Sequence, residues 1–344
     1  MRLRSILAFL ILFITSFSVQ AAPAAKTEPV KAAPVKIGLL MDTLKEERWQ
    51  KDRDLMVEHT KKVGAELLVQ AANGNDALQY SQAENLLTQG VDVLIVVPHN
   101  GVTAAAIVNL AHKAGKKVIA YDRLIQNADV DLYVSFDNLL VGKIQGEYIV
   151  KKAPKGNYIW IGGAPTDPNA AMLRDGQFEY LTPAVKRGDI KIVAEQWAKE
   201  WQASEALKHT ENALVANKNN ITAVLAPNDG TAGGVISALK QQGLVGKVVV
   251  TGQDADLPAC QRIAEGSQTM TVYKPLKQLA ATSVDSAILL AKGSAPQGIN
   301  RSTPNGSKKE IPSILLKPIA VDASNMKDTI IKDGFHTQVA VYGK

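Results

Sequence analysis

The sequence predicts an α/β protein built from two doubly wound parallel-sheet domains, and three observations support this fold class. Short apolar runs alternate with segments of helical spacing about ten times along the chain, as the strand–helix units of a parallel sheet do. The run VDVLIVVP at 91–98 is almost wholly β-branched or Leu, which is typical of a strand covered on both faces. The series restarts after 136–138, and 344 residues suit two domains. A single (β/α)8 barrel is the alternative architecture.

The first series contains five strands and three helices. Each expected helix is followed by a glycine (Gly64, Gly90 or Gly115), the residue that most readily closes a helix. The expected strands are 35–41, 66–71, 91–98, 117–121 and 132–136, and the expected helices are 46–63, 76–89 and 102–114.

The second series repeats this pattern. The expected helices are 140–151, 170–181, 204–216, 231–242, 257–264 and 276–290, and the expected strands are 157–161, 190–196, 221–226, 248–251, 270–273 and 314–320. The segment 298–309 contains several lysines and glycines and is expected to be a surface loop.

Composition excludes several classes of protein. Hydrophobic residues make up 46% of the chain and charged residues 21%, which fits a folded core and argues against disorder. The net charge of +6 is spread among acidic residues without a basic patch, so we expect no nucleic-acid partner. A single cysteine, Cys260, excludes an intrachain disulfide and multi-cysteine zinc sites, and the five histidines are far apart in sequence. We therefore expect no metal and no cofactor.

The first 21 residues have the pattern of a secretory signal peptide. Arg2 and Arg4 precede an apolar run at 6–17, and small residues follow at 19–21. We expect cleavage after Ala21, a flexible leader at 22–34, and an exported, soluble protein. No later stretch reaches the ~18 apolar residues of a membrane-spanning helix, so we do not expect the protein to be membrane-embedded.

Polar and aromatic residues gather at the ends of the predicted strands. In open α/β sheets, ligands bind beyond the C-terminal ends of the strands, so these residues are candidates for a binding site. They are Arg48, Trp49, Asp122, Arg123, Asn169, Trp201, Asn228, Asp254 and Lys274.

This set suits a neutral polyhydroxylated ligand. Carboxylates accept hydrogen bonds from hydroxyl groups, Arg and Lys donate to them, and Asn does both. The apolar face of a sugar ring can lie against an indole. A phosphate would instead favour a glycine-rich loop at a helix start, and neither common phosphate-binding motif is present.

Simpler explanations exist for several of these residues. Asp122 and Asn228 could simply cap a turn or a helix without contacting a ligand, and Arg123 could be a surface charge. Trp49 and Trp201 could be packing residues, and Lys274 could be solvated. Asp254 and Asp256 resemble half of a calcium loop, but the required glycine and terminal Glu are missing, so calcium is not expected.

Longer motifs relate the chain to a known family. They are ERWQKDRD (47–54), ANGN (72–75), AYDR (120–123), VSFDN (134–138), ND with TAGG (228–229 and 231–234), GQDADL (252–257), QTMTVYKP (268–275) and KDGFH (332–336). With them, the chain from residue 35 to 336 resembles the periplasmic sugar-binding proteins of ABC transporters, in the ribose/galactose-binding group. Within that group it is most similar to members that bind D-xylose.

The resemblance implies a site, a ligand and a partner. It assigns the nine residues above to the sugar, with Trp49 and Trp201 against the ring and the others on the hydroxyl groups. The implied protein is a monomer that binds a monosaccharide, D-xylose first, and docks on a membrane ABC permease. His99 departs from the similar members, which carry Tyr there.

The resemblance also implies two lobes and a hinge. The N-terminal lobe would contain 36–138 and 275–311, and the C-terminal lobe 139–274 and 312–344. Three chain crossings, near Asp137, Lys274 and Ile311, would form a hinge that lets the lobes close on the sugar.

Two other functions remain possible from the residues alone. An exported glycosidase could use Asp122 and Asp254 as paired carboxylates, although Arg123 and Lys274 would keep both ionised. A sugar-sensing repressor would share the fold, but the expected signal peptide occupies the place of its DNA-binding helices. We therefore expect a binding protein and not an enzyme.

Overall fold

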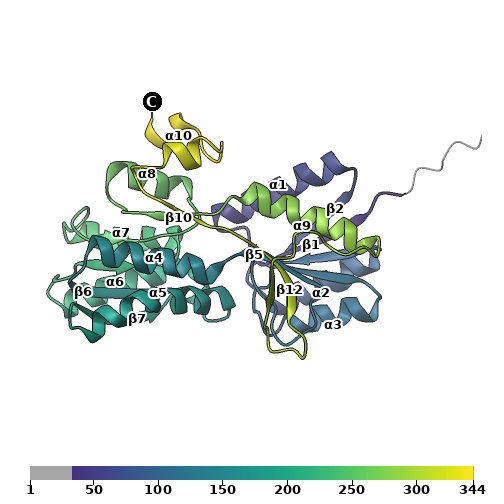
Figure 1. Ribbon diagram of the computed structural model, residues 1–344, viewed down its shortest axis with the longest axis horizontal. Coiled ribbons are helices and arrows are strands. Elements are labelled where there is room, and N and C mark those ends of the chain that lie inside the picture. Colours follow the sequence, from purple (N-terminus) through teal and green to yellow (C-terminus); the bar gives the residue numbers. More distant parts are fainter. Residues whose placement is uncertain (1–32, 344) are drawn as a thin grey trace, which may run out of the picture. The chain divides into compact units, whose positions relative to one another are not determined.

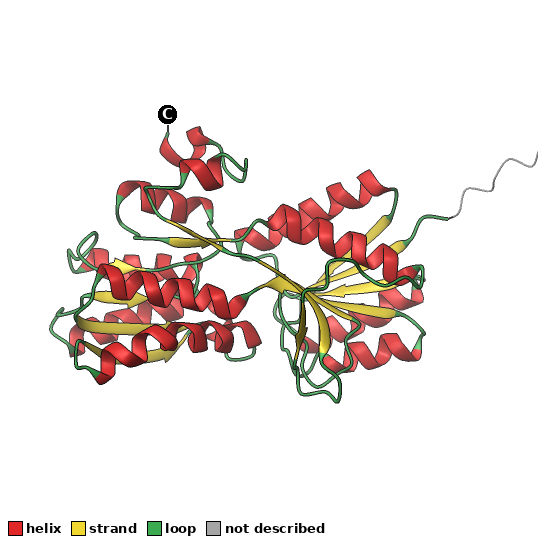
Figure 2. Ribbon diagram, in the orientation of Figure 1, coloured by secondary structure: helices red, strands yellow, loops and turns green. Residues whose placement is uncertain are grey.

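A seven-stranded sheet organises the first lobe. The computed structural model describes residues 33–343, so the expected signal peptide and nearly all of the leader lie outside the described residues. The strand order is β11-β12-β5-β4-β3-β1-β2, and every neighbouring pair is parallel except β11 with β12. Figures 1 and 2 show its elements: β1 (Lys36–Met41), α1 (Glu47–Val63), β2 (Glu66–Ala71), α2 (Asp76–Thr88), β3 (Val93–Val96), α3 (Ala105–Lys113), β4 (Lys117–Tyr121), β5 (Leu132–Phe136), α9 (Leu276–Ala291), β11 (Arg301–Thr303) and β12 (Ile311–Leu316).

Helices cover both faces of this sheet. Val93 and Ile95 of β3 belong to one hydrophobic cluster, and Leu94 and Val96 to another. Alternate residues of a strand point to opposite faces, so β3 is buried on both. The first cluster is closed by α1 and α9, and the second by α2 and α3 (Figure 1). This is the arrangement that the unbroken apolar run at 91–98 predicts.

The second lobe contains a four-stranded parallel sheet in the order β7-β6-β8-β9 and a separate antiparallel pair, β10 with β13. Helices α4 and α5 pack on one face of the larger sheet, and α6 and α7 pack on the other. The elements are α4 (Asn138–Lys152), β6 (Gly156–Gly162), α5 (Pro168–Lys186), β7 (Ile190–Trp197), η1 (Lys199–Trp201), α6 (Ala203–Ala216), β8 (Ala223–Leu225), α7 (Asp229–Gln241), β9 (Val249–Val250), α8 (Leu257–Glu265), β10 (Thr271–Tyr273), β13 (Ile319–Val321), η2 (Lys327–Ile331) and α10 (Gln338–Tyr342).

The chain passes between the lobes three times. It leaves the seven-stranded sheet at Asp137, returns at Lys274, and leaves again after Leu316. The expected third crossing near Ile311 is therefore wrong, since residues 311–316 form β12 in the first sheet. Ser313 to Leu316 pair in parallel with the last four residues of β5. Apolar strands such as β12 are typical of parallel sheets that are buried on both faces.

The expected strand at 314–320 is thus two strands in different lobes. Pro318 lies between them and has no backbone N–H to donate to a ladder, which explains the break. The expected loop at 298–309 also contains the short strand β11, whose residues Arg-Ser-Thr carry no apolar signal.

Helices α4 and α5 approach each other unusually closely. A Cβ placed on Gly142 of α4 would lie 2.1 Å from the carbonyl oxygen of Leu173 in α5. Only a residue without a side chain allows this contact, so the two helices pack backbone against backbone.

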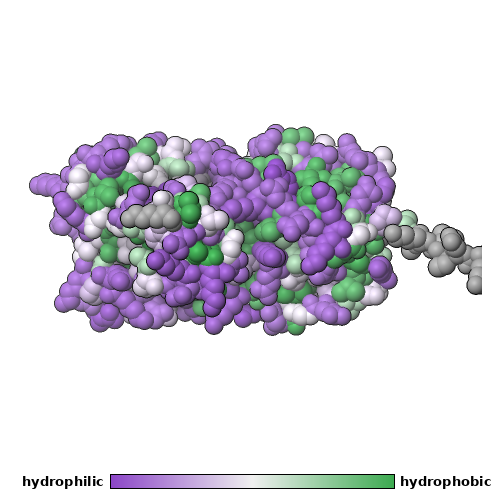
Figure 3. Space-filling view, turned by 90° about the horizontal axis from the view of Figure 1, so that it is seen from above, coloured by the Kyte–Doolittle hydropathy of each residue, from purple (hydrophilic) through white to green (hydrophobic). Residues whose placement is uncertain are grey.

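The face of the molecule seen in Figure 3 is mostly hydrophilic, with separate apolar patches. Within residues 33–343, every helix falls short of the length and apolarity that crossing a bilayer requires.

Candidate ligand-binding cleft

A narrow cavity lies between the lobes, where the C-terminal ends of several strands meet. The structure brings all nine candidate residues to this one cavity. Its lining consists of Arg48, Trp49, Asp122, Arg123, Asn169, Trp201, Asn228, Asp254 and Lys274, together with Glu46, Asp167 and Gln253.

Arg48 is buried in the first turn of α1, between two carboxylates. Its Nε and Nη2 donate to Oδ2 of Asp52 at 3.0 and 2.9 Å, and its Nη1 donates to Oδ2 of Asp122 at 2.8 Å. The hydroxyl of Tyr121 donates to the other oxygen of Asp52. Asp52 and Tyr121 were not among the candidates, although the i,i+4 spacing of Arg48 and Asp52 was a visible signal.

Asp122 follows β4 in a left-handed conformation, with φ 61°. The Ser135 hydroxyl donates to its backbone carbonyl at 2.6 Å and helps to hold this turn. Burial raises the pKa of Asp122, but the charges of Arg48 and Lys274 outweigh burial and leave the pKa below its ordinary value. Asp122 is therefore an ionised acceptor that faces the cavity.

A second carboxylate, Asp254, completes a group of buried charges. The Lys274 Nζ lies 2.8 Å from Oδ1 of Asp254 and 3.8 Å from Oδ2 of Asp122. Nη1 of Arg48 lies 3.6 Å from Oδ1 of Asp254. With Asp52, which pairs with Arg48, two cations and three carboxylates from both lobes and the hinge contact one another here. Such pairing is what allows charged groups to be buried.

Arg123 connects the lobes on the other side of the cavity. Its Nη1 lies 2.6 Å from Oδ2 of Asp42 in the first lobe, and its Nε lies 2.8 Å from Oδ2 of Asp167 in the second. The indole Nε1 of Trp201 donates to the same Asp167 oxygen at 3.2 Å. Burial raises the pKa of Asp167, and the Arg123 charge opposes this. Asp167, the N-cap of α5, was not among the candidates from the sequence.

The two tryptophans are buried side chains from different lobes. The guanidinium carbon of Arg48 lies 4.0 Å from the ring centroid of Trp49, and that of Arg123 lies 5.1 Å away. Trp201, which is 8% exposed, packs on the backbone of Gly163, where a Cβ would lie 2.2 Å from the indole. Both rings border the cavity as rigid apolar walls.

The two asparagines begin helices. Nδ2 of Asn169 donates to the side chain and backbone oxygens of Asp122, both at 3.2 Å, across the lobes. Asn228 is the N-cap of α7, and its Oδ1 accepts from the backbone N–H of Thr231 at 3.0 Å. The capping role is therefore present, but it uses Oδ1 and leaves the Nδ2 donor of Asn228 to the cavity.

Three buried oxygens in the lining have no hydrogen-bond partner within residues 33–343. They are Oδ1 of Asp254, which has only its ion pairs, Oε1 of Gln253, a residue only 4% exposed, and Oε2 of Glu46. Buried polar atoms are rarely left unpaired in folded proteins, so each of the three is available to accept a hydrogen bond. Gln253 and Glu46 were not among the candidates from the sequence.

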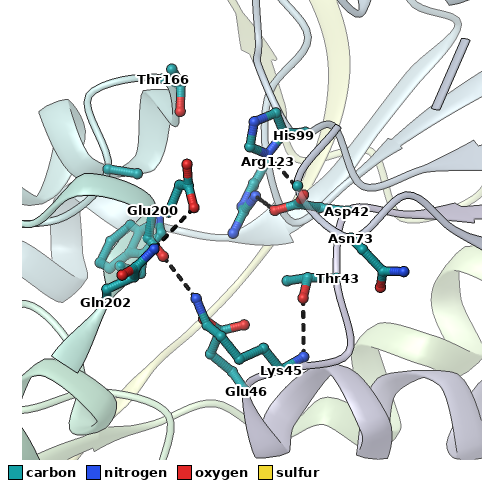
Figure 4. Close-up of a pocket in the computed structure, with 13 residues that line it drawn as sticks. Asp42, Thr43, Lys45, Glu46, Asn73, His99, Arg123, Thr166, Glu200 and Gln202 are labelled. Atoms are coloured by element: carbon teal, nitrogen blue, oxygen red, sulfur yellow. Dashed lines mark hydrogen bonds and ion pairs between the residues drawn. The ribbon is translucent and has the colours of Figure 1, made fainter. Parts of the chain in front are cut away.

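An outer pocket shares Glu46, Arg123 and Trp201 with the inner cavity. Figure 4 shows His99 and Asp42 on one side of it and Glu200 on the other. Nδ1 of His99 lies 2.9 Å from Oδ1 of Asp42. This hydrogen bond raises the pKa of His99 against the opposing effect of burial.

The arrangement can bind hydroxyl groups. The pKa of Asp122 is held low, whereas a glycosidase acid needs a raised pKa, so Asp122 does not suit the role of that acid. Among the described residues, no cluster of three His, Cys, Asp or Glu side chains could hold a metal ion.

Comparisons with known proteins agree with this chemistry. The chain is 49% identical over 342 residues to the D-xylose-binding periplasmic protein of Haemophilus influenzae, which covers 99% of this chain and 100% of that protein. It is 51% identical over 307 residues to the D-xylose-binding periplasmic protein of Escherichia coli K12, covering 89% and 92%. These relatives are binding proteins, so they give no support to the enzyme alternative.

A solved structure shows the same fold. The carbohydrate transporter solute binding protein of Chloroflexus aurantiacus, solved with D-glucose, superimposes with a TM-score of 0.83 at 30% identity and covers 88% of this chain and 97% of that one. The sequence profile of the periplasmic binding protein domain matches residues 37–295. The prediction of two doubly wound domains is confirmed, and the chain belongs to the periplasmic binding protein family, among its sugar-binding members.

Proposed function

We propose that this protein binds D-xylose in the cleft between its lobes and delivers it to an ABC permease in the membrane. The observation that carries the proposal is the buried group of Arg48, Asp122, Asp254 and Lys274, which meets inside a cavity walled by two indoles. Paired charges, directed donors and apolar walls are the combination that a pyranose requires.

Each part of the sugar has a partner in this proposal. Trp49 and Trp201 contact the apolar faces of the ring. Asp122 and Asp254 accept from hydroxyl groups, and Arg48, Arg123, Lys274, Asn169 and Asn228 donate to hydroxyl oxygens. The unpaired oxygens of Glu46 and Gln253 add two acceptors.

The polar lining favours one monosaccharide over others. A sugar that lacks a required hydroxyl leaves a buried charged group unpaired, which costs about 1–3 kcal/mol or more per group. The D-xylose-binding proteins of two other bacteria, each about half identical to this chain, support this sugar as the first to test.

Closure of the lobes would complete the site. Asn169 and Asp167 reach Asp122 and Arg123 only across the interlobe boundary, so these contacts would form as the lobes rotate about the crossings at Asp137, Lys274 and Leu316. The closed form would be the one that the permease recognises.

We also propose that the protein acts as a monomer in the periplasm after removal of residues 1–21. The signal-like sequence at 1–21 and the periplasmic names of both relatives support this location. Size-exclusion chromatography and the N-terminal sequence of the exported protein test these two points.

Isothermal titration calorimetry with purified protein tests the ligand. We expect tight 1:1 binding of D-xylose without added metal, and weaker or absent binding of D-ribose, L-arabinose and D-glucose. Absence of binding to all four sugars would refute the proposal. Hydrolysis of aryl xylosides, assayed in parallel, would reveal an enzyme instead.

A further inference from the structure

The sequence motif KDGFH at 332–336 lies outside the lining of the cavity. Even so, His336 is only 7% exposed and Phe335 is half-buried. Gly334 has φ 72°, and the Phe335 N–H donates to the carbonyl of Ile330 at 3.1 Å, so the segment forms a tight turn after η2. We call residues 332–336 the C-terminal turn.

The C-terminal turn contacts the residue that precedes Lys274. The hydroxyl of Tyr273 donates to Oδ2 of Asp333. The rings of Tyr273 and Phe335 meet edge to face, with centroids 5.0 Å apart. These contacts hold the hydroxyl and the ring of Tyr273 in place. They therefore also restrain the backbone of the next residue, Lys274, whose side chain lines the cavity.

The turn also contacts the residue that follows Asp254. A ring nitrogen of His336, Nε2, lies 2.8 Å from the carbonyl oxygen of Ala255. Because a carbonyl only accepts hydrogen bonds, Nε2 carries the proton and donates. Asp254 and Ala255 have φ values of 95° and 55°, a backbone conformation that L residues rarely adopt. The His336 hydrogen bond holds this strained loop.

A third contact reaches across to the first lobe. The ammonium of Lys51, on α1 one turn beyond Arg48, lies 3.9 Å from the Phe335 ring centroid, 3.4 Å from the Phe335 carbonyl oxygen and 3.3 Å from Nδ1 of His336. Since Nε2 of His336 is the donor, Nδ1 of the neutral ring accepts from Lys51. Phe335 packs against the hydrophobic cluster of the first lobe and also against that of α8 and α10.

We propose that the C-terminal turn positions three of the sugar contacts, Arg48, Asp254 and Lys274, and stabilises the closed arrangement of the lobes. Each of its contacts falls on a residue beside one of these groups or one helical turn away, and the three groups come from the first lobe, the second lobe and the hinge. Turn residues act through their neighbours and do not touch the sugar. The assignment rests on the proposed function.

Stopped-flow tryptophan fluorescence and calorimetry with D-xylose test the assignment, since Trp49 and Trp201 report on the cavity. We expect His336→Ala and Lys51→Met to raise the dissociation rate of D-xylose roughly 10-fold, because supporting groups commonly contribute that much to a site and act mainly on release. His336→Gln keeps a donor near Nε2 and should restore a rate within about threefold of the wild type.

Controls separate positioning from general stability. His112→Ala removes a histidine that lies 2.8 Å from Asp131 on the first lobe, far from the turn in the fold, and should leave the dissociation rate unchanged. A merely structural role of the turn would lower the melting temperature of the unliganded protein without changing the dissociation rate.

Wild-type dissociation rates in folded His336→Ala and Lys51→Met would overturn the assignment while leaving the proposed function intact. If His336→Ala does not fold, Lys51→Met decides alone, because Lys51 lies on the surface of α1. If the wild-type protein binds no sugar, the proposed function fails, and the assignment fails with it.

Discussion

Replacing Asp122 with Asn removes one charge from the cavity and keeps the shape of the side chain. The carboxylate accepts from Arg48 at 2.8 Å and from Asn169 at 3.2 Å, and it lies 3.8 Å from the Lys274 ammonium. In Asp122→Asn, Arg48 keeps its ion pair with Asp52 and Lys274 keeps its ion pair with Asp254, but both cations lose the charge of Asp122, and a ligand hydroxyl loses its charged acceptor.

The size of the effect follows from these contacts. A hydrogen bond to a charged group contributes about 1.5–3 kcal/mol, and unpairing a buried charge adds to this. We expect a loss of roughly 2–4 kcal/mol of binding free energy, which is about a 30- to 1,000-fold rise in Kd for D-xylose. Unpairing the buried charges also lowers the stability of the unliganded protein, and that part of the penalty does not weaken binding. We therefore expect the loss of binding free energy to fall in the lower half of this range.

Calorimetric titration of Asp122→Asn with D-xylose measures the change, and circular dichroism checks that the variant is folded. Asp54→Asn is the matched control, because Asp54 is an exposed carboxylate on the outer side of α1 with 66% of its side chain accessible. A Kd within twofold of the wild type in folded Asp122→Asn would refute the role of Asp122 and the charge-pairing reasoning behind it.

Three further outcomes are expected. The pKa of His99 is raised by its hydrogen bond to Asp42, so the stabilisation by this pair is present below pH 6.5 and is lost as pH rises through the raised pKa; His99→Ala should therefore lower the melting temperature more at pH 5.5 than at pH 8.5, and an equal difference at both would contradict this. Gly142→Ala should destabilise the protein by about 1–3 kcal/mol in urea unfolding, because the added Cβ would lie 2.1 Å from the Leu173 carbonyl oxygen; Gly233→Ala, in another helix with its nearest atom at 3.5 Å, should be neutral or stabilising, and similar behaviour of the two would argue against the close packing. Sugar affinity should be the same with and without EDTA in calorimetry, and a loss on chelation would reveal a metal requirement.

The sequence predicted the fold best where strands are buried between helices. The expected bounds 117–121 and 132–136 coincide with β4 and β5, because β-branched runs between polar turns leave little choice of structure. Prediction failed near the C-terminus, where β11 is a three-residue polar edge strand and β12 pairs with β5, which lies far away in the sequence. Pairing partners at such distances have no local signal.

In the candidate site, too, some residues could be predicted from the sequence and others could not. Asp122, Asp254 and Lys274 were identifiable because each directly follows a strand or its short exit turn. Asp167 and Gln253 were not, since a helix cap and a solvated amide explain them equally well from the sequence alone. Only the packing of the two lobes distinguishes these roles, because it leaves both residues at most 4% exposed.

The backbone contact at Gly142 has a mechanical consequence. Helix α4 begins at the hinge, where the Asp137 side chain caps it, and α5 begins in the cleft, where Asp167 caps it beside Asn169. Nδ2 of Asn138 donates to Oδ1 of Asn169 at 3.0 Å, so the two helix starts are also joined. Because no side chain separates the helices at Gly142, we expect α4 and α5 to move together as one rigid pair. A rotation of the lobes about Asp137 should then carry the amide of Asn169 with it.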